Sequence, residues 1–263
     1  SNLNIFTNSM NICKKLLIAV SSSFFIRSLG YSTIFSNFKK LGSKSVNKLP
    51  STSTMMLFNA FGSKPADFYE SLTGSAKEAA EYANQNIVPL KSKDGFEIAT
   101  FAAGCFWGIE LAFQRAHGVE ATHVGYTQGQ KIKPTYEEVC SGKTGHTEAV
   151  QVFFDPKMVS YNELLNILFQ KIDPTQVNGQ GNDNGTQYRT GVYPHSPEQR
   201  KVAEVFFESL KKQYSKPIAT ELVDAAVFFP AEKYHQQYLS NNGRFGAPQS
   251  AEKGCTDPIR CYG

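Results

Sequence analysis

One cysteine of this 263-residue chain stands where nucleophilic chemistry is favoured. Cys105 lies in the run Gly-Cys-Phe-Trp-Gly at 104–108, between an apolar segment at 97–103 that predicts a buried strand and a segment from 106 to about 116 with helical spacing. Free backbone N–H groups and the positive end of a helix dipole meet a sulfur at such a turn and favour its thiolate. We therefore expect Cys105 to be a reactive thiol; the alternative is a small buried core thiol.

Two aromatic residues follow this cysteine directly. Phe106 and Trp107, the chain's one tryptophan, can both belong to the core. They can equally form the wall of an apolar pocket beside the Cys105 sulfur. The sequence leaves these two interpretations open.

An acidic residue on a second predicted strand is a candidate proton donor. Residues 147–154 alternate with period two, which places Glu148 on one face with Val150, Val152 and Phe154. An apolar setting raises the pKa of a carboxyl group and keeps its proton on at neutral pH. The alternative is a glutamate at the surface or at the end of the strand.

The other cysteines are Cys13, Cys140, Cys255 and Cys261. Because Cys13 falls in a predicted leader, four would remain in about 200 residues, which is too few for the disulfide scaffold of a small secreted protein. Residues 244–263 are polar and irregular, and we expect a mobile tail whose thiols can travel to a site elsewhere. The alternative is that Cys255 and Cys261 are incidental and exposed.

The first 66 residues contain eight Lys or Arg and no Asp or Glu. This composition predicts a transit segment over 1–64; a secretory signal is the alternative, because Lys14 and Lys15 precede a short apolar run. Without these eight charges, the formal net charge of +4 becomes about −4, so the folded part has no basic excess for nucleic acid. No stretch approaches the ~20 apolar residues that cross a bilayer, so we expect no membrane span.

The remaining residues alternate predicted strands and helices without a linker, which favours one α+β domain. We expect an N-terminal extension at 65–95 with a short helix whose capping box begins at Ser75, followed by a catalytic domain at 96–263. Besides the segments around Cys105 and Glu148, the pattern predicts helices starting after Ser160 and Ser196, a loop at 177–186, strands at 188–193 and 221–229, and a short helix at 234–238.

Neither a metal site nor a phosphate loop is predicted. Cys140, His146 and His235 lack the closely spaced ligand pairs of a zinc site. We expect His146 to make a structural hydrogen bond, and His235 to pack on its short helix. The glycines between 179 and 185 lack the spacing of a phosphate-binding loop.

The motif at 104–108 resembles the signature of type A peptide methionine sulfoxide reductases. Further segments agree with that family in order and spacing, namely Pro-Thr-Tyr-Glu-Glu-Val-Cys-Ser-Gly at 134–142, Gly-His-Thr-Glu-Ala-Val at 145–150, Gly-Asn-Asp-Asn-Gly-Thr-Gln-Tyr-Arg at 181–189 and Tyr-His-Gln-Gln-Tyr at 234–238. The similarity covers about 96–263, and the ending at 253–263 is similar to plant members of the family in particular. With the composition of the leader, this ending favours a plant enzyme of the plastid type.

The resemblance implies a fold and a reaction. The fold would be a single α+β domain whose mixed sheet is packed by helices in a ferredoxin-like two-layer core, with a long irregular tail. Cys105 would attack the sulfur of methionine S-sulfoxide, free or peptide-bound, while Glu148 donates a proton to the departing oxygen. The family positions implied to line the site are Tyr136, Asp183 and Tyr188, with Phe106 and Trp107 holding the substrate methyl group.

The resemblance also implies how the enzyme is regenerated. Cys105 would become a sulfenic acid, which Cys255 and Cys261 would resolve as a disulfide, in an order that the sequence leaves open. Thioredoxin would reduce the final disulfide, with no bound cofactor. Oxidised proteins would be the substrates of a monomeric enzyme. The composition of the leader and the plant-like ending predict a plastid location, with the mitochondrion as the alternative.

Two other functions remain open on the residues alone. A thiol peroxidase also cycles through a sulfenic acid, but it leaves Glu148 without a task. A non-catalytic redox-sensing module would oxidise Cys105 without turnover. Consumption of peroxide and repeated cycles with excess reductant, respectively, separate these two functions from a sulfoxide reductase.

Overall fold

Six strands form one sheet, and the strand that precedes Cys105 lies inside it. A computed structural model describes residues 67–243 and 246–261, so the predicted transit segment at 1–64 lies outside the described residues. The strand order is β7-β6-β1-β3-β2-β8. The strands are β1 (Glu97–Ala103), β2 (Val119–Thr127), β3 (Thr147–Phe154), β6 (Thr190–Tyr193), β7 (Glu221–Leu222) and β8 (Phe229–Pro230). Only the β6–β7 pair is parallel among these neighbours, which confirms the predicted mixed sheet.

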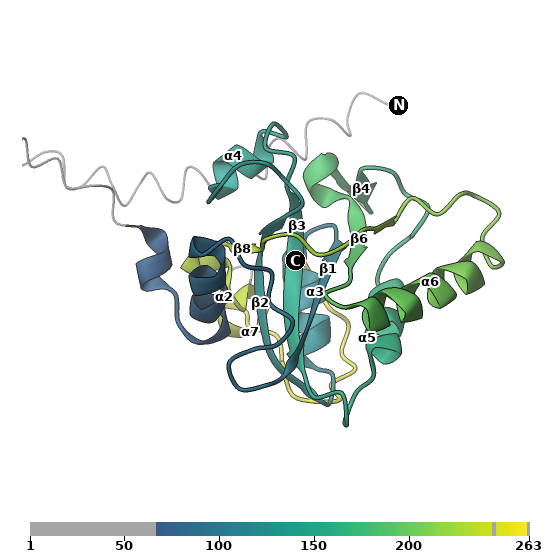
Figure 1. Cartoon of the computed structure of the whole chain (residues 1–263), viewed down its shortest axis with the longest axis horizontal. Helices are drawn as coiled ribbons and strands as arrows, with labels where there is room; N and C mark the ends of the chain where they lie inside the picture. The colour runs from purple at the N-terminus through teal and green to yellow at the C-terminus, as the bar shows by residue number, and fades with distance from the viewer. Residues whose placement is uncertain (1–66, 244–245, 262–263) are drawn as a thin grey trace, which may run out of the picture. The chain divides into compact units, whose positions relative to one another are not determined.

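Helices cover both faces of this sheet (Figure 1). The main core joins Phe101 and Val150 to α3 (Phe106–Gln114), α5 (Tyr161–Phe169) and α6 (Pro197–Lys211). Because side chains alternate along a strand, Ala102 and Ala149 face the other way. They pack with Ala79 of α2 (Gly74–Asn84) and with Phe228. The α+β class with helices packed on a mixed sheet is therefore confirmed.

Shorter elements complete the described residues. They are η2 (Phe68–Ser71), α4 (Tyr136–Cys140), the hairpin of β4 (Gly179–Gln180) and β5 (Asp183–Asn184), η3 (Thr186–Tyr188), η4 (Lys233–His235) and α7 (Tyr238–Asn241). The hairpin lies within the predicted loop at 177–186, and η3 moves the start of the predicted strand at 188–193 to residue 190.

Of the three helix caps predicted at Ser75, Ser160 and Ser196, the structure contains the last two. Ser160 forms the predicted capping box with Glu163, and Ser196 caps α6 with Pro197 at its first position. The capping box predicted at Ser75 is wrong, because α2 begins one residue earlier. The Ser75 hydroxyl instead donates to the main-chain oxygen of Thr122 at 3.3 Å, so a contact with β2 replaces the local cap.

The strand predicted over 221–229 is also wrong. Its two ends pair at opposite edges of the sheet, as β7 and β8. Between them the chain crosses the sheet, where Phe228 is buried and the Ala225 N–H donates to the Pro194 oxygen at 2.9 Å. The alternating apolar residues of 221–229 are thus explained by burial of this segment against the face of the sheet, and not by strand pairing. The short helix predicted at 234–238 is interrupted by Gln237, whose φ of 52° is left-handed.

Candidate active site

Cys105 is the N-cap residue of α3, directly after β1. Gly104 makes this turn with a φ of 77°, a conformation that residues with a Cβ rarely adopt. A Cβ at position 104 would also lie only 2.6 Å from the Cβ of Gln180 on the β4–β5 hairpin. Glycine is therefore required for the turn and for the approach of the hairpin, and the predicted position of Cys105 is confirmed.

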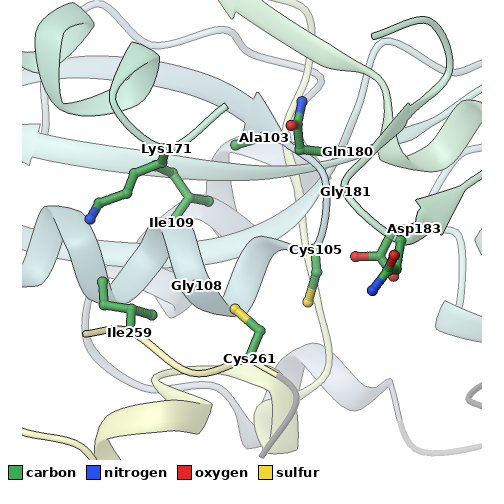
Figure 2. A pocket seen from close by; sticks show the side chains of 11 residues that line it. Ala103, Cys105, Gly108, Ile109, Lys171, Gln180, Gly181, Asp183, Ile259 and Cys261 are labelled. Carbon is green, nitrogen blue, oxygen red and sulfur yellow. The ribbon is translucent and has the colours of Figure 1, made fainter. Parts of the chain in front are cut away.

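A cavity of about 370 Å³ opens beside this cysteine. Cys105, Asp183 and Cys261 all line it, together with Gly108 on the first turn of α3. Figure 2 shows the Cys105 and Cys261 sulfur atoms on the same side of this helix start, with Asp183 opposite. Both thiols are free and half-buried. The tail thus brings one of its two cysteines into the cavity of the predicted nucleophile.

Glu148 lies on β3 with 2% of its surface exposed. Its Oε2 accepts a hydrogen bond from the Phe106 N–H at 3.1 Å. This N–H belongs to the residue directly after Cys105, so a buried carboxyl group stands at the start of the same helix. The structure excludes the alternative of a surface glutamate.

The pKa of the Cys105 thiol is raised well above its usual value, because burial removes water from the sulfur and the Glu148 carboxylate adds a negative charge. A hydrogen bond from the Trp107 backbone acts in the opposite direction but is smaller. Burial also raises the pKa of Cys261 to about 11. Burial and the Glu148 charge thus oppose ionisation of Cys105, whereas the Trp107 N–H favours it. The expectation that the helix start makes Cys105 a thiolate stays a prediction.

The two aromatic residues after Cys105 are part of a buried aromatic cluster. Phe106 and Trp107 are 1% and 9% exposed. The Trp107 indole stacks on Tyr238 with ring centroids 4.2 Å apart, and its Nε1–H donates to Nδ1 of His235 at 3.2 Å. Neither ring lines the cavity of 370 Å³. Both rings therefore pack in this buried cluster, next to the helix turn that begins at Cys105.

Tyr136 is the first residue of α4 and is 6% exposed. A capping box of Thr135 and Glu138 starts this helix, and the Tyr136 N–H donates to Oε1 of Glu232 at 2.9 Å. The Tyr136 ring lies 4.6 Å from the His235 ring. The structure therefore joins Tyr136 to the aromatic cluster through His235.

Asp183 and Tyr188 come from the segment predicted as a long loop. Asp183 is 7% exposed, lies in β5 and lines the cavity. Tyr188 is 6% exposed in η3, and the Thr147 hydroxyl holds this turn by hydrogen bonds to the oxygens of Gln187 and Arg189, each at 3.1 Å. Since Thr147 and Glu148 are adjacent on β3, one strand positions both the candidate acid and the turn of Tyr188.

The tail follows α3 and is tied to it. Arg115, just after α3, donates to the main-chain oxygens of Ser250 at 2.8 Å and Asp257 at 2.6 Å. Cys255 lies between these two points, is half-buried and does not line the cavity. The tail is thus bound at several positions in this arrangement; its predicted movement between positions stays a prediction.

Several polar residues that position the site were missed at the sequence level. Glu110, 1% exposed on α3, accepts hydrogen bonds from the Gln237 N–H at 2.9 Å and from Thr122 at 3.3 Å. Burial raises the pKa of Glu110 to about 8. The Gln236 amide bonds with the N–H and the oxygen of Val124, each at 2.9 Å. The one available signal was Glu110 on an apolar helix face.

Within the described ranges, no group of three or more His, Cys, Asp and Glu could hold a metal ion. His146 bonds through both ring nitrogens to main-chain atoms of Gly129 and Lys131, as a structural histidine does. His235 is fully buried, which lowers its pKa to about 3. Among the helices of residues 67–243 and 246–261, none has the length and apolar character to cross a membrane.

Comparison with known proteins identifies the segment that carries the site. The family model described as "Peptide methionine sulfoxide reductase" matches residues 97–256. A peptide methionine sulfoxide reductase of Lactuca sativa is 54% identical over 169 residues, which are 64% of this chain and 65% of the relative. Peptide methionine sulfoxide reductase A4, chloroplastic, of Oryza sativa subsp. japonica is 54% identical over 169 residues, which are 64% of each chain. The chain thus spans just under two thirds of these two relatives.

A solved structure shows the same fold. The crystal structure of Mxr1 from Saccharomyces cerevisiae in reduced form is 34% identical to this chain and superposes with a TM-score of 0.55. The likeness covers 59% of this chain and 90% of the yeast chain.

Proposed function

Because the chain belongs to the peptide methionine sulfoxide reductase family, we propose that it reduces the S epimer of methionine sulfoxide, free or in peptides, to methionine. The observation that carries this proposal is the helix start itself. Cys105 caps α3, and the next backbone N–H binds the buried Glu148 carboxyl group. A nucleophile and an acid therefore stand together within the matched segment. The choice of the S epimer rests on the type A resemblance.

The first step transfers oxygen from the substrate to Cys105. The Cys105 sulfur attacks the sulfoxide sulfur and forms an S–S bond to it, and the protonated oxygen moves from the substrate sulfur to the Cys105 sulfur as that S–S bond breaks. The products are methionine and a Cys105 sulfenic acid. The departing oxygen needs a proton, and Glu148 is the buried acid available at this helix start. Since the Glu148 charge raises the Cys105 pKa, a proton on Glu148 makes the thiolate easier to form. The pair is thus suited to hold one proton between them.

The other residues orient the substrate. Tyr136 and Tyr188 supply phenol hydroxyls that can donate to the sulfoxide oxygen, and Asp183 offers a carboxyl group at the cavity wall. Phe106 and Trp107 would hold the methyl group through apolar and sulfur–aromatic contact. Support for the aromatic role is the position of both rings on the first turn after the nucleophile.

The recycling order follows the position of the two tail cysteines. Cys261 shares the cavity with Cys105, whereas Cys255 lies outside it. The Cys105 sulfenic acid and the Cys261 thiol would form a disulfide and release water. Cys255 would then attack the Cys261 sulfur and free Cys105. An external dithiol, for which thioredoxin is our candidate, would reduce the Cys255–Cys261 disulfide. Because thiols carry both electrons, we propose that no bound cofactor is used.

The test of this function uses the full chain with dithiothreitol. We expect methionine to form from the S-sulfoxide and not from the R-sulfoxide, and Cys105→Ser to abolish the reaction. Hydrogen peroxide consumption at a comparable rate without sulfoxide turnover would instead indicate a thiol peroxidase. A single turnover with excess reductant would indicate a redox sensor. Either result would exclude the proposed function.

Location and assembly complete the proposal. We propose import into plastids, with mitochondrial import as the alternative. Support comes from the composition of residues 1–64 and from the rice relative, whose name describes it as chloroplastic. A fusion of 1–64 to a fluorescent protein tests it, and a diffuse cytosolic signal would contradict it. We also propose that the protein acts on oxidised proteins and that it is a monomer. Light scattering of the purified chain tests the oligomeric state.

A further inference from the structure

One side-chain amide holds the residue before Cys261. The Gln249 Nε2 donates to the main-chain oxygen of Arg260 at 2.8 Å, and the Arg260 N–H donates to Oε1 of Gln249 at 2.9 Å. Both main-chain polar groups of residue 260 therefore bond with a single side chain, as they would with a neighbouring β-strand. Because Arg260 directly precedes Cys261, these two bonds restrict where the Cys261 sulfur can lie.

Gln249 is itself attached to the frame of the active site. Its N–H donates to the main-chain oxygen of Leu239 at 2.8 Å. Leu239 is 1% exposed in α7, and α7 packs against α3, the helix that begins after Cys105. Hydrogen bonds and helix packing thus connect the segment of Cys261, through Gln249 and α7, to the helix that begins after Cys105.

The same arrangement, in which one glutamine amide bonds with both main-chain polar groups of one residue, occurs at two other places. We call this pair of hydrogen bonds the glutamine grip. The Gln236 amide binds both main-chain groups of Val124 on β2, each at 2.9 Å. The Gln180 amide binds the Asp173 N–H at 2.8 Å and its oxygen at 3.1 Å. In these cases the grip fixes a strand and the β4–β5 hairpin. At Gln249 the same grip fixes the segment of a redox-active cysteine.

The segment of Cys255 is held by different and stronger bonds. Arg115 is 7% exposed and donates to the oxygens of Ser250 and Asp257, while its own oxygen accepts from the Gly254 N–H at 2.8 Å. Hydrogen bonds from a charged, buried donor are stronger than those from an exposed neutral amide. The grip of Gln249 is exposed. Releasing the residues around Cys261 therefore costs less free energy than releasing the residues around Cys255.

We infer that Gln249 is a positioning residue for recycling, an inference that rests on the proposed function. Its amide holds the Cys261 thiol at Cys105, where the sulfenic acid and the thiol form an S–S bond and release water. Opening of the grip lets Cys261 carry that disulfide to Cys255, which stays bound at Arg115. The Cys255 sulfur attacks the Cys261 sulfur, and Cys105 leaves as the thiol. The two electrons that reduce the substrate thus come in the end from the Cys255 and Cys261 thiols, which are left as a disulfide within the tail.

Single-turnover experiments on the full chain test this role. The reduced protein is mixed with excess methionine S-sulfoxide without reductant, and quenched samples are analysed for methionine, for dimedone-trapped Cys105 sulfenic acid and for the Cys105–Cys261 disulfide. We expect Gln249→Ala to release methionine as fast as the wild type. Because two hydrogen bonds are lost, disulfide formation should slow about tenfold and the sulfenic acid should accumulate. Gln249→Glu loses the donor and should slow the same step.

Gln213→Ala is the matched control, since Gln213 is an exposed glutamine next to α6 and away from the tail. It should behave as the wild type. Disulfide formation at the wild-type rate in Gln249→Ala would overturn the inference. So would an equal slowing of methionine release, because Gln249 would then support the site itself. If the wild type releases no methionine, the proposed function fails.

Discussion

The sulfur of Cys261 occupies the space that a side chain at Gly108 would need. A Cβ built on Gly108 would overlap Cys261 Sγ, and the next nearest tail atom, on Ile259, would lie at 3.8 Å. Gly108 stands on the first turn of α3, whose N-cap is Cys105. The absence of a side chain at Gly108 therefore makes room for the Cys261 thiol next to the start of the helix that Cys105 caps.

Gly108→Ala should reveal this contact as a change in stability that depends on Cys261. Alanine in a helix interior is favoured over glycine by about 1 kcal/mol, so the substitution should stabilise a Cys261→Gly background by up to that amount. In the wild-type background the overlap should cancel or reverse the gain. Urea unfolding of the four proteins measures the coupling. An equal effect of Gly108→Ala in both backgrounds would show that the sulfur does not occupy this space.

Glu148→Gln should change two properties of the site in opposite directions. The amide can still accept the Phe106 N–H but cannot donate a carboxyl proton, so methionine release in a single turnover should slow by about 10²- to 10⁴-fold. Loss of the negative charge should lower the Cys105 pKa, so iodoacetamide should alkylate Cys105 faster at pH 8. Slower alkylation together with slower turnover would indicate a distorted site. Glu120→Gln, an exposed residue on β2, is the control for both measurements.

Trp107→Phe should cost stability even though the ring remains aromatic. The substitution removes the Nε1–H that donates to His235, and a fully buried ring nitrogen is left without this partner. An unsatisfied buried group of this kind costs about 1–3 kcal/mol in the free energy of unfolding. Tyr214→Phe removes one polar group from an exposed ring and should stay within about 0.5 kcal/mol. Equal effects of the two substitutions would show that the indole hydrogen bond contributes nothing.

Glu110 makes stability depend on pH. Burial raises the pKa of Glu110 to about 8 from its ordinary value of 4.5, so between these two pH values the folded state binds more protons than the unfolded state. The contribution of Glu110 to the free energy of unfolding is thus fully present below about pH 4.5 and is lost as the pH rises through about 8. Glu110→Gln cannot ionise, so its stability relative to the wild type should rise from pH 5 to pH 8, by up to about 1.4 kcal/mol per pH unit. Denaturant unfolding at both values measures it, and parallel pH profiles would contradict it.

Local patterns were sufficient to predict the elements that position Cys105 and Glu148. The apolar run before Gly104 and the helical spacing after Cys105 predicted β1, α3 and the turn between them with nearly the observed bounds. The alternation around Glu148 predicted β3 and the burial of its carboxyl group. These features depend on periodicity and turn chemistry, which a single sequence contains.

Features that depend on distant contacts were not accessible in this way. The segment 221–229 alternates like a strand, yet tertiary packing of Phe228 carries it across the sheet. The raised pKa of Cys105 comes from burial and from Glu148, 43 positions away along the chain, neither of which the residues around Cys105 indicate. The grip of Gln249 on Arg260 joins two residues of an irregular tail, for which no local pattern exists.

The central claim is that Cys105 attacks the sulfoxide and that Cys261 resolves it first. Mass spectrometry of the full chain after one equivalent of methionine S-sulfoxide, without reductant, tests both parts most directly. In a Cys255→Ser variant, which stops the disulfide before it moves, we predict one methionine released per chain and a single disulfide between Cys105 and Cys261. A disulfide that excludes Cys105, or methionine release that continues after Cys105→Ser, would contradict the account.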